Sequence, residues 1–421
     1  MLPIQTKLTS GELDDALRYL YGDALEAQKQ KYLALANAFE GAFGESDEAM
    51  LFSAPGRSEI GGNHTDHQLG RVLAATVTVD TRAVVAPRSD NVVRIHSQGY
   101  TPLCVTLDQL APNAAEENAS EALVRGIAER LTQTGRKVGG FDAVTASDVP
   151  KGSGLSSSAA FSILVSTIFS ELYNNGEISP VEQALASKYA ENKHFGKPSG
   201  LMDQVACAVG GFVTIDFEQP DDPKIEKIDC DLAALGYGIC IVNCGGNHAD
   251  LTPEYAAVTK EMGEVAQVFG KTVLREVDEA TFYDSLGQLR KTVSDRAILR
   301  AMHFFCDNAR VPMQAEALKS HNIETFRRLM NESGRSSFML LQNVCPTDAN
   351  ERGLALALGL SERMLKGLGA WRVHGGGFAG TILALVPLEM MVDYQTQMER
   401  VFGPGCCYRF AVRPVGGIKI G

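Results

Sequence analysis

Apolar residues recur three or four positions apart in several segments of the chain, which is the spacing of one helix face. The clearest stripe lies in residues 156–173, with apolar side chains at positions 161, 164, 165, 168 and 172, and it ends at an Asn-Asn-Gly stop signal. A second stripe, at positions 13, 16, 17 and 20, follows a Thr-Ser cap signal. Helices are therefore expected over residues 10–44, 123–132 and 156–173, through most of 254–340, and between the last two strands.

Runs rich in β-branched and apolar residues predict strands. They fall at residues 51–85, 92–96, 141–149, 211–217, 237–242, 371–374, 381–386 and 408–413. Strands and helices are grouped rather than regularly alternating, which favours an α+β fold over a doubly wound sheet. Pro220 and Pro223 lie among acidic residues in the segment 218–227, which is typical of a linker. Two domains are therefore expected, residues 1–220 and residues 221–421.

Charge and cysteine content argue against several classes of protein. The 421 residues carry 39 Lys and Arg against 51 Asp and Glu, a net charge of −12, without the clustered cations that nucleic acids and anionic membranes require. Nine cysteines, an odd number without a CxxC pair, argue against a disulfide framework and a cysteine zinc site. The most apolar stretch, Ala159–Phe169, is too short to span a bilayer. Because the first residues lack a signal-peptide pattern, a cytoplasmic protein is expected.

The segment Pro150–Ala160, PKGSGLSSSAA, joins an expected strand to the start of an expected helix. Its two glycines allow a tight turn close to a ligand, and successive N–H groups at a helix N-terminus attract phosphate. The plainer interpretation is a glycine turn followed by serine caps. Three consecutive hydroxyls exceed what one cap needs, so a phosphate-binding loop is the better hypothesis.

Two other glycine motifs fail as nucleotide sites. Residues 270–272, Gly-Lys-Thr, end like a Walker A loop, but Val265 stands where that loop needs its first glycine. Residues 375–380, GGGFAG, fit the GxGxxG pattern formally but lack a following βαβ unit, which argues against a dinucleotide site. A tight glycine turn packed near a ligand remains a sound interpretation of the second segment.

A loop crowded with polar side chains spans residues 54–67, APGRSEIGGNHTDH. Its Asn, His and Asp side chains mix hydrogen-bond donors and acceptors, which suits a polyhydroxylated ligand. A zinc site made by His64, Asp66 and His67 is the less favoured alternative, because no second cluster with metal spacing accompanies it.

A third polar cluster spans residues 191–203, ENKHFGKPSGLMD. Asp203 follows a Pro/Gly turn and opens an apolar run that ends at Val209. Taken alone, Asp203 is interpreted as a helix cap and Glu191 as a solvated helix residue. On its own, this cluster therefore predicts no activity.

Together, these segments resemble the motifs of the GHMP small-molecule kinases, and among them most closely the galactokinases. The first motif of that family reads approximately APGRVNLIGEHTDY and corresponds to residues 54–67; the second, PxGxGLSSSAA, is matched in full at residues 150–160. The third, GGGFGG, corresponds to residues 375–380, and a GxPxGxMDQ segment is matched by residues 196–204. Residues 243–255 also resemble the segment that ends in a sugar-contacting tyrosine. The motifs keep the family's order across most of the chain, which makes the resemblance more specific than any one motif.

The resemblance implies a two-lobed GHMP kinase fold, with a mixed-sheet N-terminal domain, an α+β C-terminal domain and the active site in the cleft between them. It implies ATP as co-substrate, Mg²⁺ as cofactor, and phosphoryl transfer to the anomeric hydroxyl of galactose. By position, Asp203 and Arg57 would be catalytic, with Arg57 keeping the carboxylate ionised, and Ser158 and Glu191 would bind the metal. The implied sugar-binding residues are Asn63, His64, Thr65, Asp66, Gly200 and Tyr255, and the implied nucleotide-binding residues are Ser97, Gly152, Ser153, Gly154, Leu155, Ser156, Ser157 and Ser158. The oligomeric state stays open between a monomer and a weak dimer.

The chain departs from the family at the sugar motif. Asn63 replaces a glutamate, His67 replaces a tyrosine, and Glu59-Ile60-Gly61 replaces Asn-Leu-Ile. Loss of a carboxylate at position 63 and gain of a cation at position 67 would make an anionic sugar more acceptable. We therefore expect galactose, with galacturonate or another C1-phosphorylated sugar as the alternative. A non-catalytic sensor of ATP and sugar, and a kinase of the mevalonate or homoserine type, are less favoured because the serine loop, the aspartate and the His-Thr-Asp segment are intact.

Overall fold

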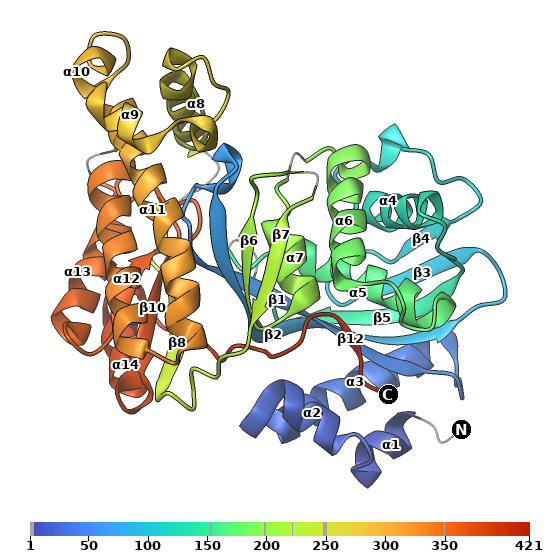
Figure 1. The fold of residues 1–421 in the computed structure, drawn as a ribbon. Coiled ribbons are helices and arrows are strands. Elements are labelled where there is room, and N and C mark those ends of the chain that lie inside the picture. Colours follow the sequence, from blue (N-terminus) through green and yellow to red (C-terminus); the bar gives the residue numbers. More distant parts are fainter. Residues whose placement is uncertain (1–3, 151–153, 198, 221, 247–250, 349) are drawn as a thin grey trace.

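The computed structural model describes residues 4–150, 154–197, 199–220, 222–246, 251–348 and 350–421. It has two lobes, each built on its own β-sheet (Figure 1). The larger, N-terminal sheet has eight strands in the order β12-β1-β2-β5-β3-β4, with β6 paired to β2 and β7 paired to β6. Its neighbours are antiparallel except for β3 and β5, which are parallel. The sheet is therefore mixed, as the sequence predicts.

The long strand β2 connects the two parts of the N-terminal sheet, because it pairs with β6 in its first half and with β5 in its second half. The strands are β1 (Met50–Gly61), β2 (Arg71–Pro87), β3 (Val92–Ser97), β4 (Leu103–Thr106), β5 (Phe141–Ser147), β6 (Phe212–Asp216), β7 (Lys224–Ile228) and β12 (Ile418–Lys419). β2 pairs with β6 through residues 71–75 and with β5 through residues 81–87. The polar segment 54–67 lies on β1 and in the turn that leads from β1 into β2.

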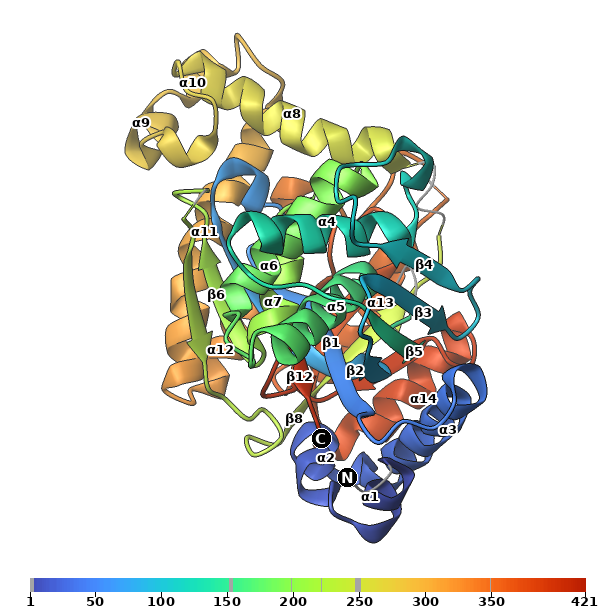
Figure 2. The same ribbon diagram turned by 90° about the vertical axis from the view of Figure 1, so that its right-hand side faces the viewer.

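Helices cover both faces of this sheet (Figures 1 and 2). One face is buried by α4 (Ser120–Gln133), α5 (Ser157–Tyr173), α6 (Pro180–Ala190) and α7 (Met202–Val209). The other face is buried through a separate core by α1 (Ile4–Ser10), α2 (Asp14–Tyr21) and α3 (Leu25–Phe43). Because α5 lies between the sheet and neighbouring helices, its residues 162–170 are all buried, serines included.

The C-terminal lobe is a four-stranded sheet between two helical layers. Its strand order is β11-β8-β10-β9, formed by β8 (Tyr237–Asn243), β9 (Ala370–Val373), β10 (Thr381–Pro387) and β11 (Cys407–Phe410). Successive β10 side chains point to opposite faces: Leu383 and Leu385 pack under α11 (Asp295–Lys319) and α12 (Ile323–Ser336), and Ile382 and Ala384 under α13 (Gly353–Leu365) and α14 (Met391–Phe402). α8 (Thr252–Val268), α9 (Glu279–Asp284) and α10 (Leu286–Leu289) pack against α11 at one end of the lobe.

Residues 218–227, which were expected to form a linker, include most of a strand, β7 (Lys224–Ile228). β7 pairs with β6 from Lys224 opposite Asp216 to Ile228 opposite Phe212, so the N-terminal sheet continues beyond the boundary expected at residue 220. The C-terminal β12 also returns to this sheet beside β1. β7 is a short edge strand whose exposed lysine and glutamate side chains conceal it in the sequence pattern. The other expected strands and helices are present, with the N-terminal helical region divided into α1, α2 and α3.

Candidate active site

Arg57 and Asp203, far apart in the sequence, form a two-pronged ion pair. Arg57 Nε donates to Asp203 Oδ1 at 2.7 Å, and Arg57 Nη2 lies 2.6 Å from Asp203 Oδ2. Arg57 lies on β1 and Asp203 in the first turn of α7. The Asp203 side chain keeps 28% of its surface exposed, whereas Arg57 keeps 11%. The carboxylate is therefore fixed in orientation and still open to a ligand.

Irregular backbone in β1 aims the Arg57 side chain. The pairing of β1 with β2 shifts register between Pro55 and Arg57, and such bulges re-aim side chains beside functional sites. The Arg57 amide donates to the Leu155 carbonyl at 3.0 Å, and Arg57 Nη1 donates to the Gly154 carbonyl. The Leu155 side chain is buried in the core, so Leu155 serves the site through its carbonyl. Arg57 thus joins the first motif to the serine loop.

The serine loop turns sharply from Gly154 to Ser156. Gly154 has φ +75°, and a Cβ there would lie 2.9 Å from His374 Cε1, so the position requires glycine. Ser156 has φ 57°, a conformation that is costly for a residue with a side chain and that clusters at functional sites. Its hydroxyl donates to Asp203 Oδ2 at 2.7 Å. Two of the expected nucleotide-binding residues lie outside the described residues: Gly152 and Ser153.

The Asp203 carboxylate is ionised at neutral pH. Burial by itself would raise the pKa of Asp203, but the charge of Arg57 and the hydrogen bonds from Arg57 and Ser156 outweigh it, and the pKa lies below its ordinary value. Among these influences, the charge of Arg57 is the largest that favours the charged form. An ionised, partly exposed carboxylate can accept a hydrogen bond, and then a proton, from a hydroxyl group.

A cavity of about 700 Å³ opens beside the start of α5. Four of the expected nucleotide or metal ligands line it: Ser97, Ser157, Ser158 and Glu191. Its walls also include residues for which the sequence predicts no site role, among them Leu103, Asn118, Leu123, Phe161 and Phe195. These residues come from separate elements, so no local pattern signals them. An apolar wall beside hydroxyls at a helix N-terminus suits a ligand with a flat ring at one end and phosphates at the other.

Glu191 begins a π-helical turn, Glu191–Phe195, that continues α6, and such turns are frequent at functional sites. The side chain is buried, and Gln204 donates to its Oε2 at 2.8 Å. Glu191 Oε1 has no hydrogen-bond partner among the residues that the structure describes. Glu191 and Ser158 line the same cavity. One carboxylate oxygen and one hydroxyl beside a phosphate site fit Mg²⁺, which prefers hard oxygen ligands and keeps several waters.

A second pocket, of about 290 Å³, lies where the polar loop meets the glycine turn of the third motif. Three expected sugar-binding residues line it: His64, Asp66 and Tyr255. Gly200 adjoins it, because a Cβ there would lie 3.3 Å from Asp66 Oδ2. Met202 lines this pocket and Ser157 lines the larger cavity. Asp203 follows Met202 in the sequence and is bonded to Ser156, which precedes Ser157, so it is linked to the lining of both spaces.

Two other expected sugar-binding residues use their side chains inside the protein. The Thr65 hydroxyl is buried and lies 2.6 Å from the Arg71 carbonyl. Asn63 is fully buried, and its amide joins the polar loop to the C-terminal lobe. Glu59 and His67, which the sequence marks only as departures from the family motif, line the pocket instead.

His64 and His67 are neutral at pH 7, because burial lowers the pKa of both, that of His67 to about 4. His64 Nε2 donates to the Gly376 carbonyl at 2.9 Å, which leaves its Nδ1 as an acceptor. The Gln68 side-chain amide, oriented by a hydrogen bond from the Leu274 N–H, donates to His67 Nδ1 at 3.3 Å. The His67 proton is then on Nε2, which is buried without a partner among the described residues. The expectation of a cation at His67 is therefore wrong.

Buried neutral histidines predict that the fold loses stability in acid. Burial lowers the pKa of His67 to about 4 and that of His374 to about 3, from 6.5. Between pH 6.5 and the folded-state pKa, about 4 for His67 and about 3 for His374, the unfolded chain binds a proton that the folded chain does not. The free energy of unfolding therefore falls in that range by about 1.4 kcal/mol per pH unit for each histidine. We expect H374Q to flatten the dependence of unfolding free energy on pH, measured by urea titration, and exposed-site H321N to leave it unchanged. An unaltered dependence in H374Q would contradict a neutral His374.

Two further features bear on the function classes considered above. Within the described ranges, no three His, Cys, Asp or Glu side chains gather as metal ligands, so His64, Asp66 and His67 form no zinc site. No helix in the part of the chain that the structure describes combines the length and apolarity needed to cross a membrane.

Comparison with known proteins agrees with this geometry. Residues 37–87 match the galactokinase galactose-binding signature, and residues 122–211 match the N-terminal domain of GHMP kinases. Among solved structures, Lactococcus lactis galactokinase complexed with galactose has a TM-score of 0.77 at 23% identity, covering 92% of this chain and 99% of that one. Methanococcus jannaschii mevalonate kinase has a TM-score of 0.62 at 16% identity, covering 87% and 99%. The fold is therefore the two-lobed α+β fold of GHMP kinases, as expected.

A curated relative narrows the assignment within this fold. The galactokinase of Glaesserella parasuis serovar 5 (strain SH0165) is 31% identical over 361 residues, which span 83% of this chain and 88% of that protein. The similarity thus extends over both lobes and nearly the whole of the relative. This chain belongs to the galactokinase family of GHMP kinases.

Proposed function

We propose that this protein transfers the γ-phosphoryl group of ATP to the anomeric hydroxyl of galactose, giving galactose 1-phosphate and ADP. The observation that carries the proposal is one ionised carboxylate, Asp203, held by Arg57 and Ser156, with its neighbour Met202 in the lining of the small polar pocket and Ser157 in that of the large cavity. The named activity of the Glaesserella relative supports the same reaction. A non-catalytic sensor is disfavoured, because Asp203 and the full serine motif are retained in the sequence.

In this reaction Asp203 accepts the proton of the anomeric hydroxyl while the sugar oxygen bonds to the γ-phosphorus and the bond to the ADP oxygen breaks. Arg57 holds Asp203 through two donors and the Gly154 carbonyl through a third group. Its fixed positive charge keeps the base ionised and counters negative charge on the transferring phosphoryl group. Binding of ATP and galactose in two separate pockets would also orient the reacting atoms, which raises the rate of transfer further.

The nucleotide is proposed to occupy the larger cavity, with its phosphates at the N-terminus of α5 and its base against the apolar wall. Ser158 and Glu191 would hold Mg²⁺ there, since both line the cavity and Glu191 Oε1 has no partner within the described part of the chain. When bound, Mg²⁺ supplies positive charge to the phosphate oxygens. Gln204 would keep Glu191 turned toward the phosphates by holding its other oxygen.

The smaller pocket favours a neutral sugar over an acidic one. Its lining carries the carboxylates of Glu59 and Asp66 and two neutral histidines, and includes neither Lys nor Arg. The carboxylate of galacturonate would lie close to those of Glu59 and Asp66, and the arginine that pairs with Glu59, Arg372, is fully buried and does not line the pocket. Mixed donors and acceptors instead match the hydroxyls of galactose.

Identification of the phosphorylated product tests this proposal. The protein is incubated with ATP, Mg²⁺ and one of galactose, galacturonate, glucose or N-acetylgalactosamine, ADP release is followed by a coupled assay, and ³¹P NMR locates the phosphate. We expect ADP release with galactose, equimolar galactose 1-phosphate, and loss of transfer when EDTA removes divalent cations. Preference for galacturonate, or binding of galactose and ATP without ADP release, would contradict it.

A further inference from the structure

Two departures from the family motif lie side by side in the structure. The motif has Asn and Glu four positions apart, and this chain has Glu59 and Asn63 at the same two positions. Asn63 Nδ2 donates to Glu59 Oε1 at 3.0 Å. The two changes therefore exchange a carboxylate and an amide between neighbouring side chains, rather than removing a negative charge from this part of the protein.

The side-chain nitrogen of Asn63 cannot donate a hydrogen bond to a ligand. Its two hydrogens are donated to Glu59 and to the Gly375 carbonyl, the latter at 2.7 Å. Its oxygen accepts from Asn343 at 2.9 Å and from Ser337 at 3.2 Å. With the side chain fully buried, Asn63 joins the polar loop to the C-terminal lobe and does not reach the sugar pocket.

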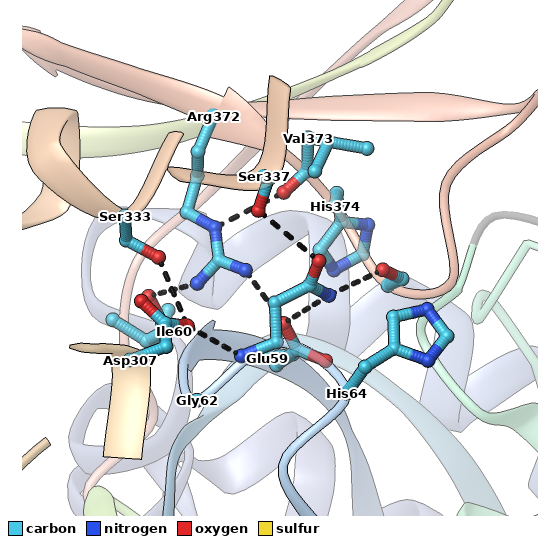
Figure 3. Close-up of polar contacts among 12 residues, drawn as sticks. Glu59, Ile60, Gly62, His64, Asp307, Ser333, Ser337, Arg372, Val373 and His374 are labelled. Carbon is cyan, nitrogen blue, oxygen red and sulfur yellow. Dashed lines mark hydrogen bonds and ion pairs between the residues drawn. The ribbon is translucent and has the colours of Figure 1, made fainter. Parts of the chain in front are cut away.

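Glu59, in contrast, has one oxygen fixed and one oxygen free. Oε1 accepts from Asn63 and from Arg372 Nη2, the latter at 2.8 Å, and Arg372 is itself fully buried (Figure 3). Oε2 has no hydrogen-bond partner among the described residues. The Glu59 side chain is 9% exposed, and that exposed part belongs to the lining of the pocket.

We propose that Glu59 is a specificity-determining residue, whose free carboxylate oxygen accepts a hydrogen bond from a hydroxyl of the sugar in place of the carboxylate that the family motif carries at position 63. The inference rests on the proposed function, and it adds the residue that restricts the substrate to a hydroxyl-bearing, neutral sugar. A buried acceptor left without its hydroxyl is costly, so analogues that lack that hydroxyl are rejected. A carboxylate at the same place on the sugar is rejected by like charge.

The change E59Q tests this with little change of shape. The substituted side chain can still accept from Arg372 and Asn63 through its amide oxygen, but it presents an N–H donor where Oε2 was. We expect kcat/KM for galactose to fall about 10- to 100-fold, and the affinity for ATP to stay unchanged. The matched control is E261Q, because Glu261 is an equally buried, Arg-paired glutamate outside the pocket.

A series of 2-, 3-, 4- and 6-deoxygalactose separates recognition from a structural role. One of these analogues lacks the hydroxyl that Glu59 binds, so the wild type already has a low kcat/KM for it. We expect E59Q to lower kcat/KM for that analogue by less than about a further threefold, since both changes remove the same hydrogen bond. An equal E59Q loss on galactose and on every analogue, or no loss at all, would overturn the inference. A wild-type protein that phosphorylates no galactose would overturn the proposed function first, and the wild-type arm alone shows it.

The double change E59N/N63E returns both side chains to the family arrangement and tests the exchange directly. We expect E59N to lose activity with galactose and E59N/N63E to regain most of it, because a glutamate at position 63 is one methylene longer than asparagine and can extend its carboxylate toward the pocket that Glu59 lines. The readout does not depend on E59Q folding well. A double variant that is no more active than E59N, although its thermal unfolding matches that of the wild type, would contradict the exchange.

Discussion

The change D203N is expected to lower kcat for galactose by at least about 10²-fold while leaving ATP bound with wild-type affinity. The amide cannot take up the proton of the anomeric hydroxyl, and it cannot accept two charge-assisted hydrogen bonds from Arg57 as the carboxylate does at 2.7 and 2.6 Å. The cavity proposed for the nucleotide is lined by other residues. Steady-state kinetics with a separate measurement of nucleotide binding check both parts.

A second Arg–Asp pair in the protein supplies the control for D203N. Arg94 contacts Asp142 through the same two nitrogens, Nε at 2.6 Å and Nη2 at 2.7 Å, away from both pockets. D142N breaks a pair of the same geometry and also a contact from Arg88 to the same carboxylate. Because Asp142 lines neither pocket, turnover of D142N should match the wild type. Full turnover in D203N, or an equal loss in D142N, would exclude Asp203 as the proton acceptor.

The change R57K is expected to lower kcat by about 10²- to 10³-fold, although it preserves the positive charge. Lysine offers a compact ammonium group and cannot span both Asp203 oxygens and the Gly154 carbonyl as the guanidinium does. Loss of this contact also removes an influence that lowers the pKa of Asp203. The acid limb of the kcat–pH profile should therefore move to higher pH.

Measurement of kcat against pH in R57K and in R94K tests this role. R94K changes the matched pair and should leave both turnover and the acid limb in place. A lower kcat in R57K with an unmoved acid limb would show that Arg57 acts on the transferring phosphoryl group without setting the charge of Asp203. Wild-type kcat in R57K would contradict the assigned role altogether.

The elements of the fold were predictable wherever the signal is local. The helix α5 follows from apolar spacing within its own seventeen residues, and β5 from a β-rich run that ends before Pro150. β7 was not predictable in this way, because an exposed edge strand lacks an apolar face and lies beside prolines. Its existence depends on pairing with β6, which no local pattern reports.

The same difference between local and long-range signals applies to the residues of the candidate site. The contact between Arg57 and Asp203 joins residues 146 positions apart, and only the resemblance to a family brought them together. Glu59 appeared in the sequence as a departure, and its orientation depends on Arg372, which is more distant still. Asn63 was expected to contact sugar, yet His303 and Asp307 of the C-terminal lobe bind its backbone and help to bury it. The position of a residue in a motif predicts the role it has in the family, but whether its side chain is buried depends on residues far away in the sequence.

The most direct test of the central claim is a crystal structure of the protein with galactose, Mg²⁺ and a non-hydrolysable ATP analogue. The account predicts the sugar in the pocket lined by His64, Asp66 and Glu59, its anomeric oxygen within hydrogen-bond distance of Asp203, and the terminal phosphate of the analogue on the far side of that oxygen. A sugar bound elsewhere, or an anomeric oxygen that points away from Asp203, would contradict it.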